Sequence, residues 1–541
     1  MKKLFFLAFS FTILLSLNCQ SQTDPVVEKM IEIGTTDNQS MEYLDVLSNR
    51  FGGRLIGSDA YENAAEWAAY KFREWGMEVV FDEVGELPVG FNRGPWFGKL
   101  LGEEGMTLHF ATPSYTSGTK GVQRGPVLIE PKTQSEFNRM KGKLKGAWVL
   151  ISGENRGFPI DYSEEANEIR DSIKIENARI EEQNNEIRRQ NWYSRETGEE
   201  KKDLLDLIEE PALFYKEMKE AGILGIVQSS KVPIKAMSDK NNYMEMTFGN
   251  LPDLPDIKLD EHQYAKIKKM VEERRYFQLE FDIRNHFKMG PVKYYNVIGV
   301  IPGTEYPDEY VMMGAHLDAY DVATGGVDDG SGVTPTMEAA RLIMEAGGKP
   351  KRTIMVALWA GEEFGLLGSQ SWVDRNKDIL DKVSNYVNRD SGPLAPVGLS
   401  VSEAMMKDFE QICAPMSEIH ADIPFEISER KPRSKPKRPW GTDSGPFAVE
   451  GVPTIGFQLE DVFGYNFSYR EIWHTERDTY NMSIPVYQEH AATTTAVLVY
   501  GLANLDHLLS RDGYYKNDEE TNKTNQKELK KKESKKKNSI K

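Results

Sequence analysis

The feature that most constrains the fold is an alternation of apolar runs and helical patterns between residues 294 and about 509. Runs typical of buried strands include "YYNVIGVIPG", "EYVMMGAHLDA" and "RTIMVALWAGEE", whereas "TPTMEAARLIMEAG" between them has apolar residues at helical spacing. Strands that alternate with helices predict an α/β domain whose mixed, mostly parallel sheet is flanked by helices. A closing helix is expected through "HAATTTAVLVYGLANLDHLL".

Side chains suited to metal binding or proton transfer follow three of these predicted strands. His316 and Asp318 come after "EYVMMGA", the adjacent Glu362 and Glu363 come after "TIMVALWAG", and Asp390 comes after "VSNYVNR". Ligands of open α/β sheets bind outside the carboxyl ends of the strands, where the following loops converge. We therefore expect these side chains to meet at one edge of the sheet.

Two further segments add residues of the same chemical kind. The run "GGVDDGSG" places Asp328 and Asp329 just before a predicted helix, and "IWHTERDT" supplies His474. A lone histidine is more often a structural residue, and an acidic pair more often lies on the solvent-exposed surface. Neither explanation accounts well for a whole set of such residues at one edge of the sheet. Imidazole and carboxylate ligands suit zinc, and bridging carboxylates suit a pair of metal ions.

The motifs "GAHLDAYDVATGGVDDGSGV", "LWAGEEFGLLGSQ", "NRDSG" and "WHTERDT" resemble the zinc-site motifs of the co-catalytic zinc exopeptidases. That family includes secreted bacterial leucine aminopeptidase, glutamate carboxypeptidase and plasma glutamate carboxypeptidase. The resemblance covers about residues 39–105 and 294–509. It implies a phosphorylase/hydrolase-like fold, two Zn²⁺ ions per chain, peptide substrates, and hydrolysis of a terminal peptide bond by a metal-activated water.

The resemblance also implies a role for each ligand. Asp328 would bridge the two zinc ions, His316 and Asp390 would complete one site, and Glu363 and His474 would complete the other.

Two acidic residues that bind no metal have implied roles beside the ligands. Glu362 would be the general base, and Asp318 resembles a carboxylate that orients the histidine ligand, although a helix-cap or turn role for Asp318 stays open. Asp329 is the alternative bridging residue. We choose Asp328 because it lies three residues before Ser331, as in the family motif. Asp478 is expected to make local hydrogen bonds.

The sequence departs from the family pattern in two places. Asp443 and Ser444, in "WGTDSGPF", stand where many relatives carry an Asp-His pair. Trp473 precedes the last ligand where the glutamate carboxypeptidases place an oxyanion-stabilising tyrosine, so that group must come from elsewhere or be missing. The basic run "ERKPRSKPKRP", residues 429–439, is either a solvated loop or a cation for a substrate carboxylate.

Outside the α/β pattern, the sequence divides into segments of different character. Residues 23–107 are expected to begin the catalytic domain and residues 291–510 to complete it. The β-rich stretch 108–290 resembles an inserted protease-associated domain, best in "EAGILGIVQSS", and carries a charged helical insertion over residues 162–206 that is either a solvent-exposed excursion or a partner-binding arm. The polar, lysine-rich tail 511–541 is expected to be disordered.

The first 22 residues have the pattern of a secretory signal peptide, with a Lys2-Lys3 head and an apolar run over residues 4–17. "LSLNC" resembles a relaxed bacterial lipoprotein box, so Cys19 is a candidate lipid anchor, with ordinary cleavage as the alternative. The expected location is therefore periplasmic, outer-membrane-anchored or extracellular. The only other cysteine is Cys413, which leaves no internal disulfide and no cysteine-based zinc site to expect.

The composition and the motifs favour an enzyme over other classes of protein. A net charge of -17 argues against nucleic acid as a partner. An exopeptidase, preferably an aminopeptidase but alternatively a dipeptidase or carboxypeptidase, is the favoured hypothesis. A receptor-like binding protein on the same scaffold and a glutaminyl cyclase are the alternatives. The sequence decides neither the oligomeric state nor which end of a peptide is shortened.

Overall fold

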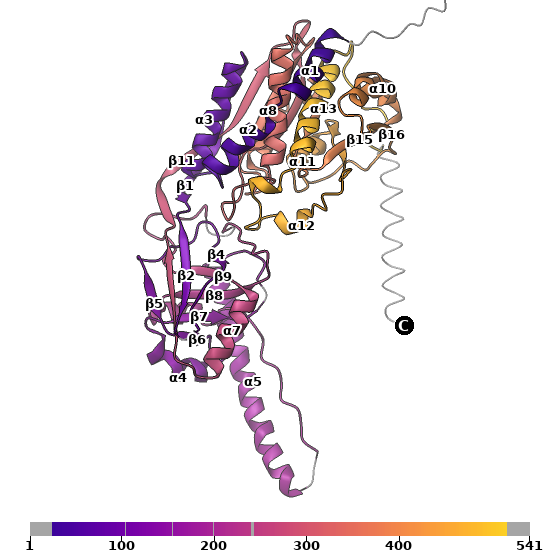
Figure 1. Cartoon of the computed structure of the whole chain (residues 1–541). Helices are drawn as coiled ribbons and strands as arrows, with labels where there is room; N and C mark the ends of the chain where they lie inside the picture. The colour runs from indigo at the N-terminus through magenta and orange to yellow at the C-terminus, as the bar shows by residue number, and fades with distance from the viewer. Residues whose placement is uncertain (1–23, 103, 154, 198–199, 240–242, 517–541) are drawn as a thin grey trace, which may run out of the picture.

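The computed structural model describes residues 24–102, 104–153, 155–197, 200–239 and 243–516, and Figure 1 shows the whole molecule. The expected signal segment with Cys19, and residues 517–541 of the expected tail, lie outside the described residues. No helix in the described part of the sequence combines the length and the apolar character that a bilayer span requires.

A six-stranded mixed sheet forms the centre of the larger domain, in the order β1-β11-β13-β12-β14-β17. Strands β13, β12, β14 and β17 run parallel, whereas β1 and β11 pair antiparallel at one side. This confirms the predicted α/β fold with a mixed sheet. The strands are β1 (Glu78–Asn92), β11 (His286–Ile301), β12 (Tyr306–His316), β13 (Arg352–Trp359), β14 (Val383–Asn388) and β17 (Thr454–Ile455).

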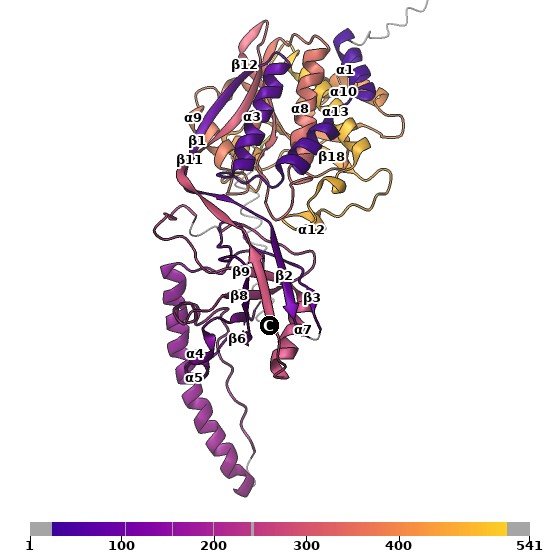
Figure 2. The ribbon, with the colours of Figure 1, turned by 60° about the vertical axis from the view of Figure 1, so that its left-hand side comes forward.

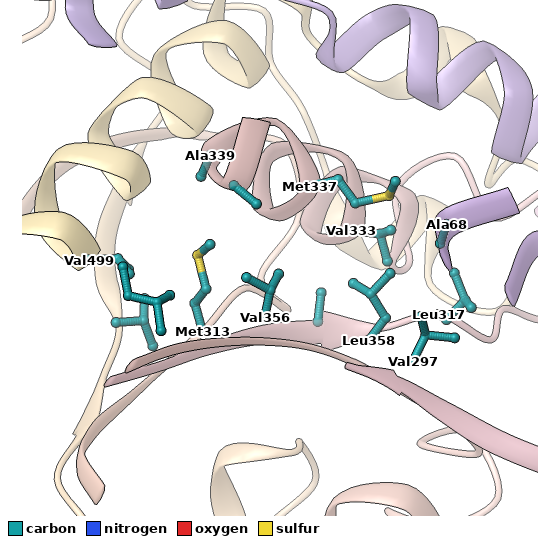
Figure 3. Packing of buried hydrophobic residues seen from close by; sticks show 14 of the residues in the cluster. Ala68, Val297, Met313, Leu317, Val333, Met337, Ala339, Val356, Leu358 and Val499 are labelled. Atoms are coloured by element: carbon teal, nitrogen blue, oxygen red, sulfur yellow. The ribbon is translucent and has the colours of Figure 1, made fainter. Parts of the chain in front are cut away.

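Helices cover both faces of this sheet because its central strands are apolar on both sides. On one face, Val333 and Met337 of α8 lie above Met313, Val356 and Leu358 of the strands (Figure 3). Side chains alternate along a strand, so the neighbouring positions of β12 and β13 pack on the opposite face against α9 and α11. The covering helices are α1 (Pro25–Thr36), α2 (Ser40–Leu44), α3 (Asp59–Glu74), α8 (Gly330–Glu345), α9 (Leu367–Arg375), α11 (Ser444–Glu450) and α13 (Pro485–Ala503).

Smaller elements complete this domain. A three-stranded sheet has the order β16-β15-β18 and packs beside α10 and α13. These elements are β15 (Ala395–Val401), β16 (Glu426–Glu429), β18 (Phe457–Glu460), α10 (Met406–Cys413) and α12 (Tyr469–Ile472), with a π-helical turn η1 (Asp45–Phe51) and 3-10 turns η2 (Leu380–Lys382), η3 (Glu403–Met405), η4 (Ala414–Glu418) and η5 (Tyr480–Met482).

A second group of sheets, which we call the inserted module, lies below this domain in Figure 1 and has apolar clusters of its own. A five-stranded sheet has the order β4-β9-β8-β7-β6, and a four-stranded sheet has the order β3-β2-β10-β5. Their elements are β2 (Trp96–Leu101), β3 (Met106–Thr107), β4 (Phe110–Ala111), β5 (Gln123–Gly125), β6 (Val127–Ile129), β7 (Trp148–Ile151), β8 (Gly225–Ser230), β9 (Asp256–Asp260), β10 (Gln278–Ile283), α4 (Gln134–Leu144), α6 (Tyr215–Glu220) and α7 (Glu261–Glu272).

The long strands β1 and β11 run from the central sheet toward the inserted module, as both ribbon views show (Figures 1 and 2). Strand β2 pairs with β10 and β3 pairs with β2, so both belong to the inserted module although the sequence places residues up to 107 in the catalytic domain. Their partner lies about 180 residues later in the sequence, and a local sequence pattern carries no information on such pairing. The junction therefore lies before Trp96 rather than at residue 108.

A single long helix, α5 (Glu164–Thr197), projects from the inserted module, and the following segment returns along it (Figure 1). Three asparagines seven positions apart share one face of α5, because seven residues make nearly two helical turns. Each amide accepts from the main-chain N–H and donates to the main-chain oxygen of one residue of the returning segment, at 2.7–3.0 Å. The pairs are Asn177 with Ile208, Asn184 with Leu205, and Asn191 with Lys202.

The last described residues pack against the larger domain. Tyr514 is 1% exposed and belongs to its main apolar cluster, and its hydroxyl accepts a hydrogen bond from the main-chain N–H of Thr454 at 2.8 Å. The ordered part of the protein therefore continues beyond residue 511, where the sequence predicts a disordered tail. In the sequence, the aromatic pair Tyr514-Tyr515 indicates that this part of the predicted tail packs against the domain.

Candidate metal centre

Three parallel strands end at nearly the same level and place their following residues together. His316, the last residue of β12, is opposite Trp359, the last residue of β13, and Gly314 is opposite Asn388 at the end of β14. The loops that carry Glu362 and Asp390 therefore start beside His316. This is the sheet edge at which the sequence predicts the site.

The predicted ligands converge around Asp328. One carboxylate oxygen, Oδ1, lies 3.2 Å from His316 Nε2, and the other, Oδ2, lies 3.5 Å from His474 Nε2. His316 Nε2 is 3.8 Å from Asp390 Oδ1, and His474 Nε2 is 3.0 Å from Glu363 Oε2. Asp328 thus faces two separate groups of ligand atoms, one with His316 and Asp390 and one with Glu363 and His474.

The cluster is buried and strongly acidic. No lysine or arginine among the residues described forms an ion pair with Asp328, Glu362, Glu363 or Asp390. The ion-pair partners of Asp328, Glu363 and Asp390 are the two histidines. Burial raises the pKa of Glu362 to about 10, and the Glu363 carboxylate adds to this effect against the opposing charge of His316. Burial also raises the pKa of Glu363, with the neighbouring Asp328 as the next cause. Buried carboxylates at such short separations are ionised at low cost only when bound cations compensate their negative charge.

The donor atoms fit zinc. Two atoms bound to one tetrahedral zinc ion at about 2.0–2.2 Å lie about 3.3–3.6 Å from each other, and the four separations above range from 3.0 to 3.8 Å. Glu363 Oε1 is buried and has no hydrogen-bond partner among the described residues, so this oxygen is available to bind a metal ion. Nitrogen and carboxylate oxygen donors without a thiolate are a usual set for zinc.

Asp329 also lies near His316 and Asp390, within the distance range of a metal cluster. Its Oδ2 accepts a hydrogen bond from the main-chain N–H of His316 at 3.1 Å, so one of its oxygens is already engaged. Its carboxyl is buried, and burial raises its pKa well above the usual range. These contacts favour Asp328 as the residue shared by both ligand groups, whereas the Asp329 side chain is bonded to the main chain of His316.

Asp318 fixes the acidic pair rather than the histidine ring. Its Oδ1 accepts from the main-chain N–H of Glu362 and its Oδ2 from that of Glu363, each at 3.2 Å. His316 Nδ1 lies 2.9 Å from the main-chain oxygen of Asp318 but 3.8 Å from its carboxylate. The hydrogen bond that orients His316 therefore involves the Asp318 main chain, which corrects the carboxylate contact expected from the sequence.

Asp478 also acts over a longer range than the sequence predicts. Its Oδ1 accepts from the main-chain N–H of Val327 at 2.7 Å, and its Oδ2 lies 3.3 Å from that of Asp328. The two segments are about 150 residues apart in the sequence. Asp478 therefore ties the loop of the last ligand, His474, to the loop of Asp328.

The ligands line a cavity of about 480 Å³ together with Trp473 and with Tyr469, which the sequence did not single out. Tyr469 of α12 lines the cavity, and its hydroxyl is one of the groups that lower the pKa of the Asp328 carboxylate. Trp473 is 42% exposed at the rim. Tyr469 lies five residues before His474, in the run "YREIWH". It is the first residue of the one-turn helix α12, which directly precedes Trp473 and His474.

The remaining sequence-based candidates lie around this cavity or away from it. Thr442 lines the cavity, and the adjacent Asp443 is buried, with its pKa raised to about 7 by burial. The basic loop 429–439 is not among the cavity-lining residues. Arg430 and Arg433 instead stack on Tyr514, so the described structure gives these two arginines a packing role.

Known proteins match both the larger domain of this protein and its metal-type motifs. The model of peptidase family M28 matches residues 296–498. Carboxypeptidase Q of Mus musculus is 30% identical over 236 residues, which are 42% of this chain and 46% of the mouse protein. The alignment therefore spans about half the length of that relative.

Two longer matches extend over most of the sequence. Carboxypeptidase Q of Xenopus laevis is 26% identical over 490 residues, or 88% of each protein. The solved structure of a peptidase M28 precursor from Shewanella amazonensis is 19% identical, covers 90% of this protein and 97% of its own length, and has a TM-score of 0.54, which shows a shared fold. All of the metal-type motifs at the predicted sheet edge lie within residues 296–498, the part of the sequence that matches the model of peptidase family M28.

Proposed function

We propose that this protein is a zinc-dependent exopeptidase that hydrolyses a terminal peptide bond of peptides. The single observation that carries the proposal is the position of Asp328, whose two oxygens face two different imidazoles, His316 and His474, at 3.2 and 3.5 Å. A shared carboxylate between two ligand groups is what a pair of metal ions requires. The match to peptidase family M28 and the carboxypeptidase names of the relatives support the same interpretation.

In this proposal, His316 and Asp390 would hold one zinc ion, Glu363 and His474 would hold the other, and Asp328 would contribute to both. When bound, two zinc ions would supply Lewis acidity, which lowers the pKa of water and polarises the scissile carbonyl.

Glu362 is the proton carrier of the proposed reaction. It lines the cavity beside the ligands, and the hydrogen bond from its main chain to Asp318 holds its loop in place. Its carboxylate takes a proton from the attacking water while the water oxygen bonds to the carbonyl carbon. The same proton then passes to the departing nitrogen as the C–N bond breaks, so that an amine leaves and a carboxylic acid remains, which loses its proton to give the carboxylate.

Tyr469 is the proposed oxyanion-stabilising group. Its hydroxyl is beside Asp328 at the cavity wall, where a tetrahedral oxyanion would develop. Burial raises the pKa of this hydroxyl, which keeps it protonated and able to donate. A fixed donor aimed at developing negative charge is the usual means of stabilising such an intermediate. Tyr469 would fill the role left open by Trp473.

The inserted module, residues 96–283, is proposed to be a protease-associated-like domain that forms one wall of the site. It has its own apolar clusters, and its segment 234–236 hydrogen bonds to the main chain around His474. Through this segment, the module can contribute side chains to the rim of the cavity.

Digestion of a peptide library by the purified full-length protein with zinc tests the proposed function. Free amino acids or dipeptides should appear, and mass spectrometry should show one end of each peptide shortened by whole residues. The Glu362→Gln variant is the matched control and should leave the library intact. Pyroglutamate formation in place of hydrolysis would support a glutaminyl cyclase, and the lack of stoichiometric zinc with no turnover would support a binding protein.

A further inference from the structure

A short segment of the inserted module is fixed against the loop that carries His474. The main-chain N–H of Ala236 donates to the His474 oxygen at 3.3 Å, and that of Glu476 donates to the Ile234 oxygen at 3.1 Å. Lys235 lies between these bonds and forms an antiparallel bridge with Thr475. The register of the two segments therefore places Lys235 next to a proposed zinc ligand.

The Lys235 side chain lies over an aromatic ring of the cavity rim. Its Nζ is 3.6 Å from the centre of the Trp473 ring, well within the range of a cation–π contact. Trp473 itself lines the cavity that contains His316 and Glu362. Among the residues that the structure describes, no carboxylate lies within ion-pair distance of the Lys235 ammonium, which is half-buried.

The charge of Lys235 acts on the site as well. Burial lowers the pKa of Lys235, and the Asp328 and Glu363 carboxylates oppose part of this effect. The Lys235 ammonium at the rim can bind an anionic group of a ligand.

We propose that Lys235 binds the free α-carboxylate of the substrate residue that leaves, which makes the protein a carboxypeptidase or dipeptidase rather than an aminopeptidase. This inference rests on the exopeptidase function proposed above and assigns the end of the peptide on which it acts. A C-terminal residue has its carboxylate within one residue length, about 3.6 Å, of the scissile bond. A cation at this place repels the free ammonium group of an N-terminus, and Trp473 offers an apolar surface to the leaving side chain.

The test uses the zinc-loaded full-length protein and compares three substrates by the rate at which the bond between alanine and leucine is cleaved, measured by mass spectrometry. These are the dipeptide Ala-Leu, its C-terminal amide, and N-acetyl-Ala-Leu. The free acid and its acetylated form should both be cleaved, and the amide should have a kcat/KM at least tenfold lower, mainly through KM. A hydrogen bond to a charged group is worth enough for an effect of about tenfold to a hundredfold.

Three variants separate recognition from structure. Lys235→Met should raise the KM for Ala-Leu about tenfold or more, leave kcat within about threefold, and leave the amide unchanged. Lys235→Arg should keep the preference for the acid. Lys231→Met, which removes an exposed lysine of the same segment, is the matched control and should behave as the unchanged protein.

Each other outcome has a definite meaning. Equal cleavage of the acid and the amide, or an unchanged preference in Lys235→Met, would overturn the inference while the exopeptidase function stands. Cleavage of Ala-Glu amide with the same dependence on Lys235 would assign the lysine to an acidic side chain and overturn the C-terminal assignment. If no substrate is cleaved and no zinc is bound, the proposed function itself fails.

Discussion

The carboxylate of Asp318 accepts a hydrogen bond from the main-chain N–H of Glu362 at 3.2 Å, and its second oxygen accepts one from the next residue, Glu363, at the same distance. One buried side chain therefore positions two adjacent carboxylates that have different proposed tasks. Glu363 lies 3.0 Å from His474 in the ligand cluster, whereas Glu362 lines the cavity.

Substitution of this positioning residue should weaken the site without unfolding the domain. In Asp318→Asn, the amide nitrogen cannot accept a hydrogen bond, so one of the two main-chain N–H groups loses its partner. Zinc affinity or kcat should fall about tenfold to a hundredfold, as is usual for groups that support metal ligands. Zinc titration and steady-state kinetics measure the effect, and circular dichroism checks the fold. Unchanged zinc affinity and unchanged kcat would show that Asp318 has no positioning role.

Removal of the Tyr469 hydroxyl should slow the chemical step. The loss of one oxyanion donor costs about 10²–10³ in kcat, so Tyr469→Phe should lower kcat by that amount with little change in KM. Tyr465→Phe is the control, because Tyr465 is an exposed tyrosine near α12 that does not line the cavity. A kcat within twofold of the unchanged protein would remove Tyr469 from the mechanism.

The stability of the zinc-free protein should decrease as the pH rises from about 5 to 9. Burial raises the pKa of Glu362 to about 10 and that of Asp478 to about 7, from ordinary values of 4.5 and 3.8. The folded protein therefore holds protons that the unfolded protein has already released, and stability falls with pH across this window. Below the ordinary values both states are protonated and the stabilising effect is complete.

Thermal unfolding of chelator-treated protein at pH 5, 7 and 9 measures this effect. The melting temperature should fall toward pH 9, and saturation with zinc should reduce or reverse the decline, because bound cations favour the ionised carboxylates. A zinc-free protein that melts at a higher temperature at pH 9 than at pH 5 would contradict the burial of these acids.

The asparagine contacts of α5 should hold the returning segment in place. Asn184→Ala leaves both main-chain groups of Leu205 without the partner that they have in the structure. We expect faster proteolysis between residues 200 and 210, with unchanged peptide hydrolysis because the site is elsewhere. Limited proteolysis followed by mass spectrometry measures the cleavage rate, with Asn185→Ala as the control on the exposed face. Equal rates for the two variants would show that the contact does not order this segment.

The sequence predicts those parts of the site that depend on strand ends. His316, Glu363 and Asp390 directly follow or end apolar strands, so the parallel sheet alone brings them together. Asp328 and His474 are on loops, and they were placed by the resemblance of their motifs rather than by periodicity.

The sequence does not predict contacts that depend on how distant loops pack. Asp478 reaches a loop about 150 residues away, and Lys235 reaches the site from a different module. The pairing of β2 with β10 likewise joins segments about 180 residues apart. Hydrophobic periodicity reports only which face of an element is buried, so partners at such separations follow from the tertiary structure alone.

The zinc content of two variants tests most directly whether Asp328 is the shared metal ligand and Glu362 the proton carrier. Glu362→Gln and Asp328→Asn should be purified with the unchanged protein, loaded with zinc, dialysed, and measured by inductively coupled plasma mass spectrometry alongside peptide hydrolysis. We predict that Glu362→Gln keeps nearly all of its zinc while kcat falls by about 10²–10⁴, the usual contribution of a general base, and that Asp328→Asn loses both zinc and activity. Equal zinc loss in both variants, or full zinc binding in Asp328→Asn, would contradict the assignment of Asp328 as the shared ligand and Glu362 as the proton carrier.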